Sequence, residues 1–364
     1  MSDPASVAQT EPQAFMRSVL QRIATGPEYS KDLPQEEARA ALNLILDGQA
    51  DPVQAGIFFI ALRMKRETLE ENAGSLEALR DHTEPAVADV AQVVDVAEPY
   101  DGFVRGLPVG AFLPAVLSAC GVPAVCHGAE TVGPKFGVTP RQILRACGAN
   151  VDRTTAEAAA RVGDAECGWS YVDQSQFCPA LHQLLEFRTR IVKRPVLTTV
   201  EVLLSPVRGR DATHLVTGYV HKPYPPVYAH LARVAGFDSA LIVRGVEGGV
   251  FPSLKQAGKA FGFHGDEEET EWNFHADDLD FTHDSRAVPL PDDDLPAEQV
   301  AQAAAEAGLA ALAGQAGPAK DSLQYAAAMI LAHLDGSRDI RHHYPGACEA
   351  IDSGRARARF EAGS

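Results

Sequence analysis

Short apolar runs recur along this 364-residue chain, and segments with helical patterns separate them. The clearest of these runs are Val93–Val96, Val122–Val125, Leu215–Val220 and Ala240–Val243. Helices are expected between them, for example from Val116 to Gly121 and from Pro140 to Cys147. Because parallel strands need crossover connections, this alternation predicts an α/β domain over residues 86–360, with a mainly parallel sheet covered on both faces.

Residues 15–85 carry a helical pattern without strands. Leu33-Pro34-Gln35-Glu36-Glu37 places a proline and acidic residues in a first helical turn, and Asp47-Gly48 is typical of a helix end. Asp51-Pro52 and Glu67-Thr68 start two further helices. The pattern predicts a small all-α domain, preceded by a disordered tail over residues 1–14.

Charge is distributed unevenly along the chain, whose formal net charge is −17. Residues 263–298 hold thirteen acidic side chains and one base, Arg286, with little apolar content. We expect this segment to be an acidic loop or a poorly ordered insertion in the α/β domain. Bases outnumber acids between Phe187 and Pro225, and such segregation favours an anionic ligand on one face.

Several protein classes are not expected from this sequence. No apolar run approaches the roughly 20 residues that a membrane span needs, and Met1–Pro12 has no secretory pattern. The six cysteines form no C-x-x-C motif, which suits free thiols in a reducing cytoplasm. No H-E-x-x-H motif occurs, and His342-His343 has no metal-site partner nearby, so we expect no zinc site.

Five stretches carry a resemblance to a known family. They are Leu33-x-x-Glu36-Glu37-Ala38, Ala61-Leu62-Arg63-Met64-Lys65-x-Glu67-Thr68, Cys120–Gly128, Cys178–Arg188 and Gly317-Pro318-Ala319-Lys320-Asp321. From about residue 15 to 355 the chain resembles the anthranilate phosphoribosyltransferases of glycosyltransferase family 3. The resemblance implies a helical domain joined by helices within residues 160–195, a ligand cleft between the two domains, and a homodimer.

The motifs of active relatives are only partly present. The reaction needs magnesium on the leaving diphosphate, amides that cradle phosphate, and a nearby cation. Relatives supply these with Gly-Thr-Gly-Gly-Asp, Lys-His-Gly-Asn-Arg, Asn-x-Ser-Thr and an Asp-Glu pair. At the matching places stand Glu98–Gly102, Cys126–Glu130, Pro108–Ala111 and Val250-Phe251. We therefore predict an eroded site, with no catalytic residue and no assigned metal ligand.

Three functions stay open at this point. Gly245–Phe251 is similar to a signature of a divergent branch whose members are described as dimeric nucleic-acid binders, so the first is binding of a phosphate-bearing small molecule or single-stranded nucleic acid. The second is an active phosphoribosyl- or other glycosyltransferase with a rebuilt site, in which Glu98, Asp101 or Glu247 would hold Mg²⁺. The third is a regulatory or structural homodimer.

Candidate residues for anion binding each have an alternative interpretation. His127-Gly128 forms either an anion-binding turn or an ordinary turn. Asp101-Gly102 ends Glu98–Gly102, the loop that stands in place of Gly-Thr-Gly-Gly-Asp. Lys135 is either a ligand contact or a solvated lysine. Arg188 matches an arginine that contacts the aromatic acid, but it also lies at a helix end that favours cations. Cys126 is either a reactive or an inert thiol.

A basic face is the last candidate. With Arg188, its members are Arg190, Lys193, Arg194, Arg208, Arg210 and Lys222. Tyr219, Tyr224 and Tyr228 would offer stacking surfaces beside it, as in binders of single-stranded nucleic acid. The alternative is a solvated basic surface without a ligand.

Overall fold

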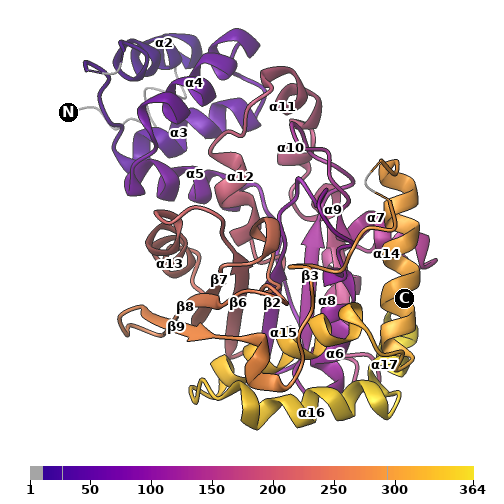
Figure 1. Ribbon diagram of the computed structural model, residues 1–364. Helices are drawn as coiled ribbons and strands as arrows, with labels where there is room; N and C mark the ends of the chain where they lie inside the picture. Colours follow the sequence, from indigo (N-terminus) through magenta and orange to yellow (C-terminus); the bar gives the residue numbers. More distant parts are fainter. Residues whose placement is uncertain (1–10, 27, 293) are drawn as a thin grey trace.

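The N-terminal unit is a bundle of helices, at the upper left of Figure 1. The computed structural model describes residues 11–26, 28–292 and 294–364. The bundle contains α2 (Pro12–Ile23), α3 (Gln35–Leu46), α4 (Pro52–Lys65) and α5 (Leu69–Asp81). Of the predicted tail, residues 1–10 lie outside the described residues. Helix α2 begins before the predicted end of that tail, with a proline in its first turn, where the missing N–H is not needed.

Side-chain caps fix two of these helix starts where the sequence predicts them. The Asp51 carboxylate accepts the Val53 N–H at 2.8 Å at the start of α4. At α5, Thr68 and Glu71 form a reciprocal capping box. The buried Glu71 carboxylate also accepts the Leu33 N–H at 2.9 Å and lies 2.7 Å from Lys65 Nζ. Glu71 thereby ties three segments of the bundle together.

A seven-stranded sheet forms the larger unit, in the order β4-β3-β2-β6-β7-β8-β9. The first five strands are parallel and the last two are antiparallel, which confirms the predicted mainly parallel sheet. In chain order they are β2 (Gln92–Ala97), β3 (Ala124–Gly128), β4 (Trp169–Asp173), β6 (Ala212–Gly218), β7 (Ser239–Val243), β8 (Gly258–His264) and β9 (Thr270–Phe274). A separate parallel pair joins β1 (Ala86–Val87) to β5 (Val207–Arg208).

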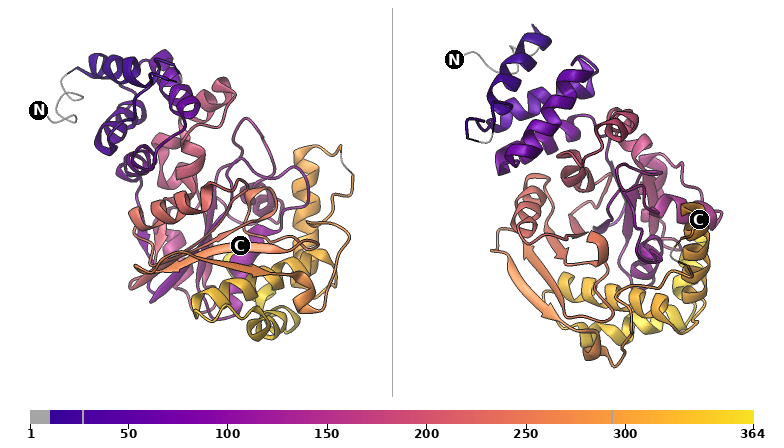
Figure 2. Two further views of the ribbon diagram at one scale, coloured as in Figure 1. Left: turned by 60° about the vertical axis from the view of Figure 1, so that its left-hand side comes forward. Right: turned by 45° about the horizontal axis from the view of Figure 1, so that its top comes forward.

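Alternate residues of the strands point into two different cores. Val93 and Ala97 pack with the helical bundle and with α8 (Thr155–Gly163) and α13 (Tyr224–Val234). Val94 and Val96 pack on the opposite face. The helices there are α6 (Leu113–Ala119), α7 (Pro140–Ala146), α14 (Ala297–Leu312), α15 (Pro318–Leu334), α16 (Ile340–Asp352) and α17 (Arg355–Gly363). Figure 2 shows α14–α17 at the end of the molecule opposite to the bundle.

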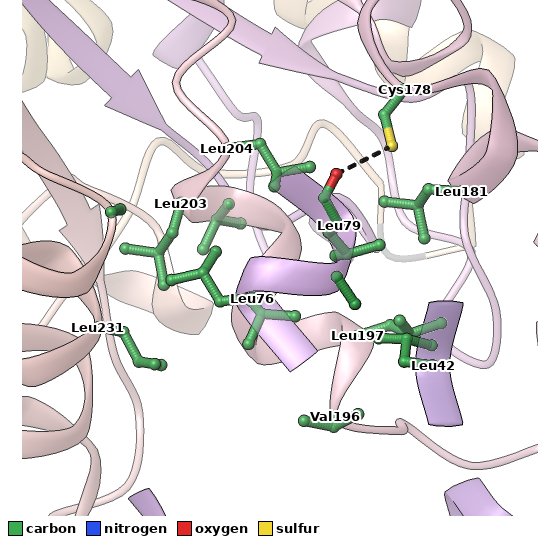
Figure 3. Close-up of a cluster of buried hydrophobic side chains, with 14 of the residues drawn as sticks. Leu42, Leu76, Leu79, Cys178, Leu181, Val196, Leu197, Leu203, Leu204 and Leu231 are labelled. Atoms are coloured by element: carbon green, nitrogen blue, oxygen red, sulfur yellow. Dashed lines mark hydrogen bonds between the residues drawn. The ribbon is translucent and has the colours of Figure 1, made fainter. Parts of the chain in front are cut away.

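Four short helices connect the two units. They are α9 (Gln174–Phe177), α10 (Pro179–His182), α11 (Leu185–Ile191) and α12 (Leu197–Val200). Figure 3 shows the apolar joint, where Leu76 and Leu79 of α5 lie among Leu197, Leu204 and Leu231. Burial of such side chains contributes roughly 1.5–3 kcal/mol each. The joint is therefore a continuous core and not a flexible linker.

Two segments differ from expectation. The buried strand β4 is not among the strands expected from the sequence, because polar Ser170 and Asp173 shorten its apolar run. The acidic segment 263–298 includes the end of β8 and all of β9, an edge strand whose Glu271 pairs with Lys259 at 2.7 Å. The Glu271 and Asn273 side chains of β9 are exposed on one face of the sheet, and Phe274 is buried on the other. Among the described residues, no helix is long and apolar enough to cross a membrane.

Candidate functional site

The candidate site lies at the carboxyl ends of the parallel strands, where such sheets usually bind ligands. The loops after β2, β3, β6 and β7 meet there, opposite the end of α4 and the start of α12. They enclose a cleft of about 460 Å³ between the two units. The cleft is lined by polar and aromatic residues that include Arg63, Glu67, Asp101, Arg105, Lys135, Arg194, Thr198, Thr217, Tyr219, His221, Tyr224, Tyr228 and Glu247.

His127 is fully buried beneath this cleft and does not reach it. The Tyr100 hydroxyl hydrogen bonds to Nδ1, and Nε2 lies 2.8 Å from Asp95 Oδ1, in a direction poor for a hydrogen bond. Both ring nitrogens therefore face internal partners. Gly128 is also buried, against Tyr100 and Tyr171. Neither His127 nor Gly128 lines the cleft, so the structure gives no support to an anion-binding turn there.

Lys135 is mostly buried, so it is not the solvated lysine of the alternative interpretation. Its Nζ lies 2.9 Å from Glu247 Oε2, contacts the Gly102 carbonyl, and lies 5.4 Å from the Phe103 ring centroid. Glu247 also accepts the Arg105 N–H at 2.7 Å. We call this set of contacts the Lys135–Glu247 tie. It fastens the loop after β7 to the loop after β2.

Backbone geometry explains the glycines of the Gly245–Phe251 segment. Glu247 has φ 55° and Gly248 has φ 88°, both in the left-handed region. A Cβ at Gly249 would lie 2.6 Å from Glu98 Oε2 and 2.7 Å from the Phe103 ring. The turn can therefore approach the β2 loop only because this position has no side chain. The segment is built to present Glu247 to that loop.

Glu98 is a buried carboxyl group below the same turn. One oxygen accepts the Val250 N–H at 3.2 Å, and the other has no hydrogen-bond partner among the described residues. Burial raises the pKa of Glu98 to about 8. The group therefore stays largely protonated at neutral pH. Burial also raises the pKa of the adjacent Cys126 thiol, as expected for an inert cysteine.

The carboxylates near the cleft do not form a magnesium site. Glu67 lines the cleft, and burial raises its pKa. Asp101 is paired with Arg194, at 2.6 Å. Glu247 is occupied by two backbone N–H groups and Lys135, and Glu98 is buried and largely neutral. Magnesium requires ionised oxygen ligands that are free to coordinate. Within the described ranges, no three His, Cys, Asp or Glu side chains converge as metal ligands.

Arg188 also lies away from the cleft. It is fully buried and forms a two-pronged ion pair with Glu201, at 2.6 and 2.8 Å, and it lies 3.3 Å from Thr198 Oγ1. Its charge is compensated inside the protein. The interpretation of Arg188 as a ligand contact is not supported, because a bound acid would have to displace Glu201.

The basic residues do not form one continuous face. Arg208 and Arg210 precede β6 and Lys222 follows it, and the seven residues of that strand separate its ends by roughly 20 Å. Arg190 pairs with Glu186, Arg194 with Asp101, and Arg210 with Asp89. Lys193 and Lys222 are exposed. The predicted basic face is thus divided between the two opposite ends of the strands.

Two arginines that the sequence did not single out for ligand binding lie at the cleft. Arg63, at the end of α4, donates to the Arg194 carbonyl at 2.6 Å, and Arg105 belongs to the loop that Glu247 holds. Neither has a carboxylate within 4 Å in the part of the chain that the structure describes. The predicted tyrosines do line the opposite wall, where the Tyr224 ring centroid lies 6.3 Å from that of His221 and 6.0 Å from that of Tyr228.

Comparison with known proteins shows where this architecture occurs. The helical bundle domain of a glycosyl transferase family matches residues 17–83, and the a/b domain of that family matches residues 107–357. The second match alone covers more than half of the chain. The chain belongs to glycosyltransferase family 3. The resemblance inferred from the sequence is confirmed at the level of the family.

Relatives in glycosyltransferase family 3 include curated enzymes. Anthranilate phosphoribosyltransferase of Thermomicrobium roseum is 27% identical over 94% of both chains, and that of Sphingopyxis alaskensis is 28% identical over 93% of this chain and 97% of its own. An uncharacterized protein of Aquifex aeolicus is 30% identical over 65% of this chain and 71% of its own.

Solved structures of the family share the fold. Anthranilate phosphoribosyltransferase of Saccharomyces cerevisiae has a TM-score of 0.77 at 17% identity, with 96% of each chain covered. The enzyme of Thermus thermophilus has a TM-score of 0.74 at 18% identity, covering 95% of this chain and 97% of its own. These likenesses confirm the helical bundle joined to a mainly parallel α/β unit.

Proposed function

We propose that this member of glycosyltransferase family 3 binds a phosphate-bearing ligand in its cleft and does not make phosphoribosyl anthranilate. The observation that carries the proposal is the lining of the cleft. Arg63 and Arg105 offer charged N–H donors without carboxylate partners among the described residues, and Tyr224 and His221 offer ring faces in the same cleft. Phosphate and a base are the groups that such a lining recognises.

The loss of transfer chemistry is supported by how the β2 loop is filled. Tyr100 occupies part of the loop that is glycine-rich in active relatives, and its hydroxyl is held by the buried His127. The space beside Glu98, Phe103 and Val288 is a cavity of only about 40 Å³. A cavity of this size has room for water only. Because no cluster of metal-ligating side chains occurs among the described residues, the leaving group would also lack its magnesium counter-ion.

Binding is expected to depend on the two free arginines. Fluorescence anisotropy with a labelled single-stranded oligonucleotide, and calorimetry with adenosine diphosphate, would measure it at two salt concentrations. The double substitution Arg63→Gln and Arg105→Gln is expected to weaken binding at least roughly tenfold, because each charge-assisted hydrogen bond contributes about 1.5–3 kcal/mol. The matched control is Arg357→Gln, an exposed arginine of α17 paired with Glu361.

Nucleic acid and a small phosphate-bearing ligand should give different results in these binding measurements. Steeply salt-dependent binding of the oligonucleotide supports nucleic acid, whereas binding of the diphosphate alone supports a small ligand. The unaltered protein should show no consumption of anthranilate when phosphoribosyl pyrophosphate and Mg²⁺ are present. Turnover in that assay, or binding that the double substitution leaves unchanged, contradicts the proposal.

We infer that the helical bundle mediates a homodimer. An apolar groove of about 570 Å³ runs between α2 and α4, and beside it Val53 and Met64 are 69% and 75% exposed. Such side chains on one face indicate a protein partner. Val53→Asp with Met64→Glu should convert a dimer to the 38.8 kDa monomer in light scattering, while Val87→Asp should not. A monomeric unaltered protein at micromolar concentration would refute this.

A further inference from the structure

A second polar pocket lies at the joint between the helical bundle and the α/β unit. Its volume is about 350 Å³, and it is lined by Arg39, Glu77, Arg80, Asp81, Thr83, Pro85, Leu204 and Arg208. Arg208 ends β5 and precedes β6, whereas Thr217 and Gly218 of the cleft end β6. The pocket therefore lies at the amino end of β6, whereas the cleft lies at its carboxyl end. The pocket is near the apolar joint of Figure 3.

The charges in this pocket are unequally compensated. Arg39 is neutralised, because its guanidinium lies 2.7 Å from Asp81 and 3.9 Å from Glu77. Arg80 and Arg208 have no carboxylate within 4 Å among residues 11–26, 28–292 and 294–364. The three arginines and two carboxylates of the pocket leave a net charge of +1, and Arg80 and Arg208 are the two cations without a direct ion pair among the described residues.

Both free guanidinium groups reach the carboxyl end of α13. Arg80 Nη1 donates to the Val234 carbonyl at 2.8 Å. Arg208 Nη2 donates to the Ala235 carbonyl at 2.6 Å, and its Nη1 donates to the Gly236 carbonyl at 3.2 Å. Each guanidinium has five N–H donors, so most of them have no acceptor among the residues that the structure describes.

Capping of α13 explains one of these cations but not both. A helix end carries roughly half a negative charge, which a single arginine balances. The second arginine adds repulsion, and burial together with the charge of Arg80 lowers the pKa of Arg208. Two arginines that share a pocket and have no direct ion pair are typical of phosphate recognition, because their planar forks match its oxygen atoms.

We propose that this pocket binds a small phosphate-bearing anion, which bridges Arg80 and Arg208. Arg80 belongs to α5 of the helical bundle, and Arg208 belongs to β5 of the α/β unit. The anion therefore contacts both units at once. Its binding stabilises their joint, independently of any ligand in the cleft.

Inorganic phosphate is the probe for this site. Calorimetry at constant ionic strength should show saturable binding that is at least tenfold weaker in Arg80→Gln and in Arg208→Gln. Glutamine retains an N–H donor for the α13 carbonyls, so both variants should fold. Arg357→Gln is the matched control and should bind like the unaltered protein. The cleft variant with Arg63→Gln and Arg105→Gln should keep this phosphate site.

A second measurement uses the unaltered chain, in case either variant fails to fold. Amide chemical shifts of Thr83 and of Gly209, which follows Arg208, should move with added phosphate and saturate at the calorimetric concentration. Absence of saturable binding would overturn the proposal. So would shifts confined to the cleft, or affinity that neither Arg80→Gln nor Arg208→Gln lowers.

Discussion

Glu201→Gln is expected to lower the free energy of unfolding by about 3–5 kcal/mol. The substitution removes the partner of Arg188, whose guanidinium is fully buried and would keep its charge without compensation. A buried unpaired charge is among the largest destabilising effects of a single substitution. Urea denaturation followed by circular dichroism would measure the change.

Two controls separate the buried charge from other causes. Glu186→Gln breaks the exposed pair with Arg190 and should change stability by less than about 0.5 kcal/mol. The double variant Arg188→Met and Glu201→Leu removes both buried charges and should recover much of the loss, because apolar replacements of a buried pair are often tolerated. If Glu201→Gln were as mild as Glu186→Gln, the ion pair would not be buried as described.

Acidification is expected to destabilise the fold through His333. This buried histidine lies 3.1 Å from Ser239 Oγ and stacks on His264, with ring centroids 4.5 Å apart. Burial, followed by the nearby charges of His264 and His214, lowers the pKa of His333 from 6.5 to about 3. Between these values the unfolded chain binds more protons than the folded chain, so stability falls as pH falls.

The expected loss from His333 is roughly 2–3 kcal/mol between pH 7 and pH 4.5. Urea denaturation at the two pH values would measure it. His333→Gln keeps a donor for Ser239 and cannot be protonated, so its stability should depend less on pH. His343→Gln, at an exposed pair with Asp335, is the control. Equal pH dependence in His333→Gln and the unaltered protein would exclude this role.

The periodic parts of the fold could be predicted from the sequence because burial of one face leaves a repeating pattern. Strands β2, β3, β6 and β7 follow from their apolar runs, and α3–α5 follow from stripes and caps. Strand β4 was missed since Ser170 and Asp173 interrupt its run, although helices bury it. Strand β9 was missed because it lies in the acidic segment and has only two apolar residues, Trp272 and Phe274.

The site was harder to predict because internal pairing leaves no local pattern. Nothing around His127 indicates that Asp95 and Tyr100 will enclose it. A run of cations from Arg188 to Arg194 does not reveal that one is buried with Glu201 and another is paired with Asp101. Sequence locates the loops of the site, but the partners of each charge depend on the tertiary arrangement.

The Lys135–Glu247 tie has a consequence for how fast a ligand would associate. The rim of the cleft is already ordered by the protein itself, through contacts that no ligand has to supply. Encounter should therefore lead to capture without a slow rearrangement. The association rate should depend on salt concentration and should not be limited by a slow closure of the cleft. In this molecule, recognition would resemble docking onto a rigid surface more than the folding of a lid.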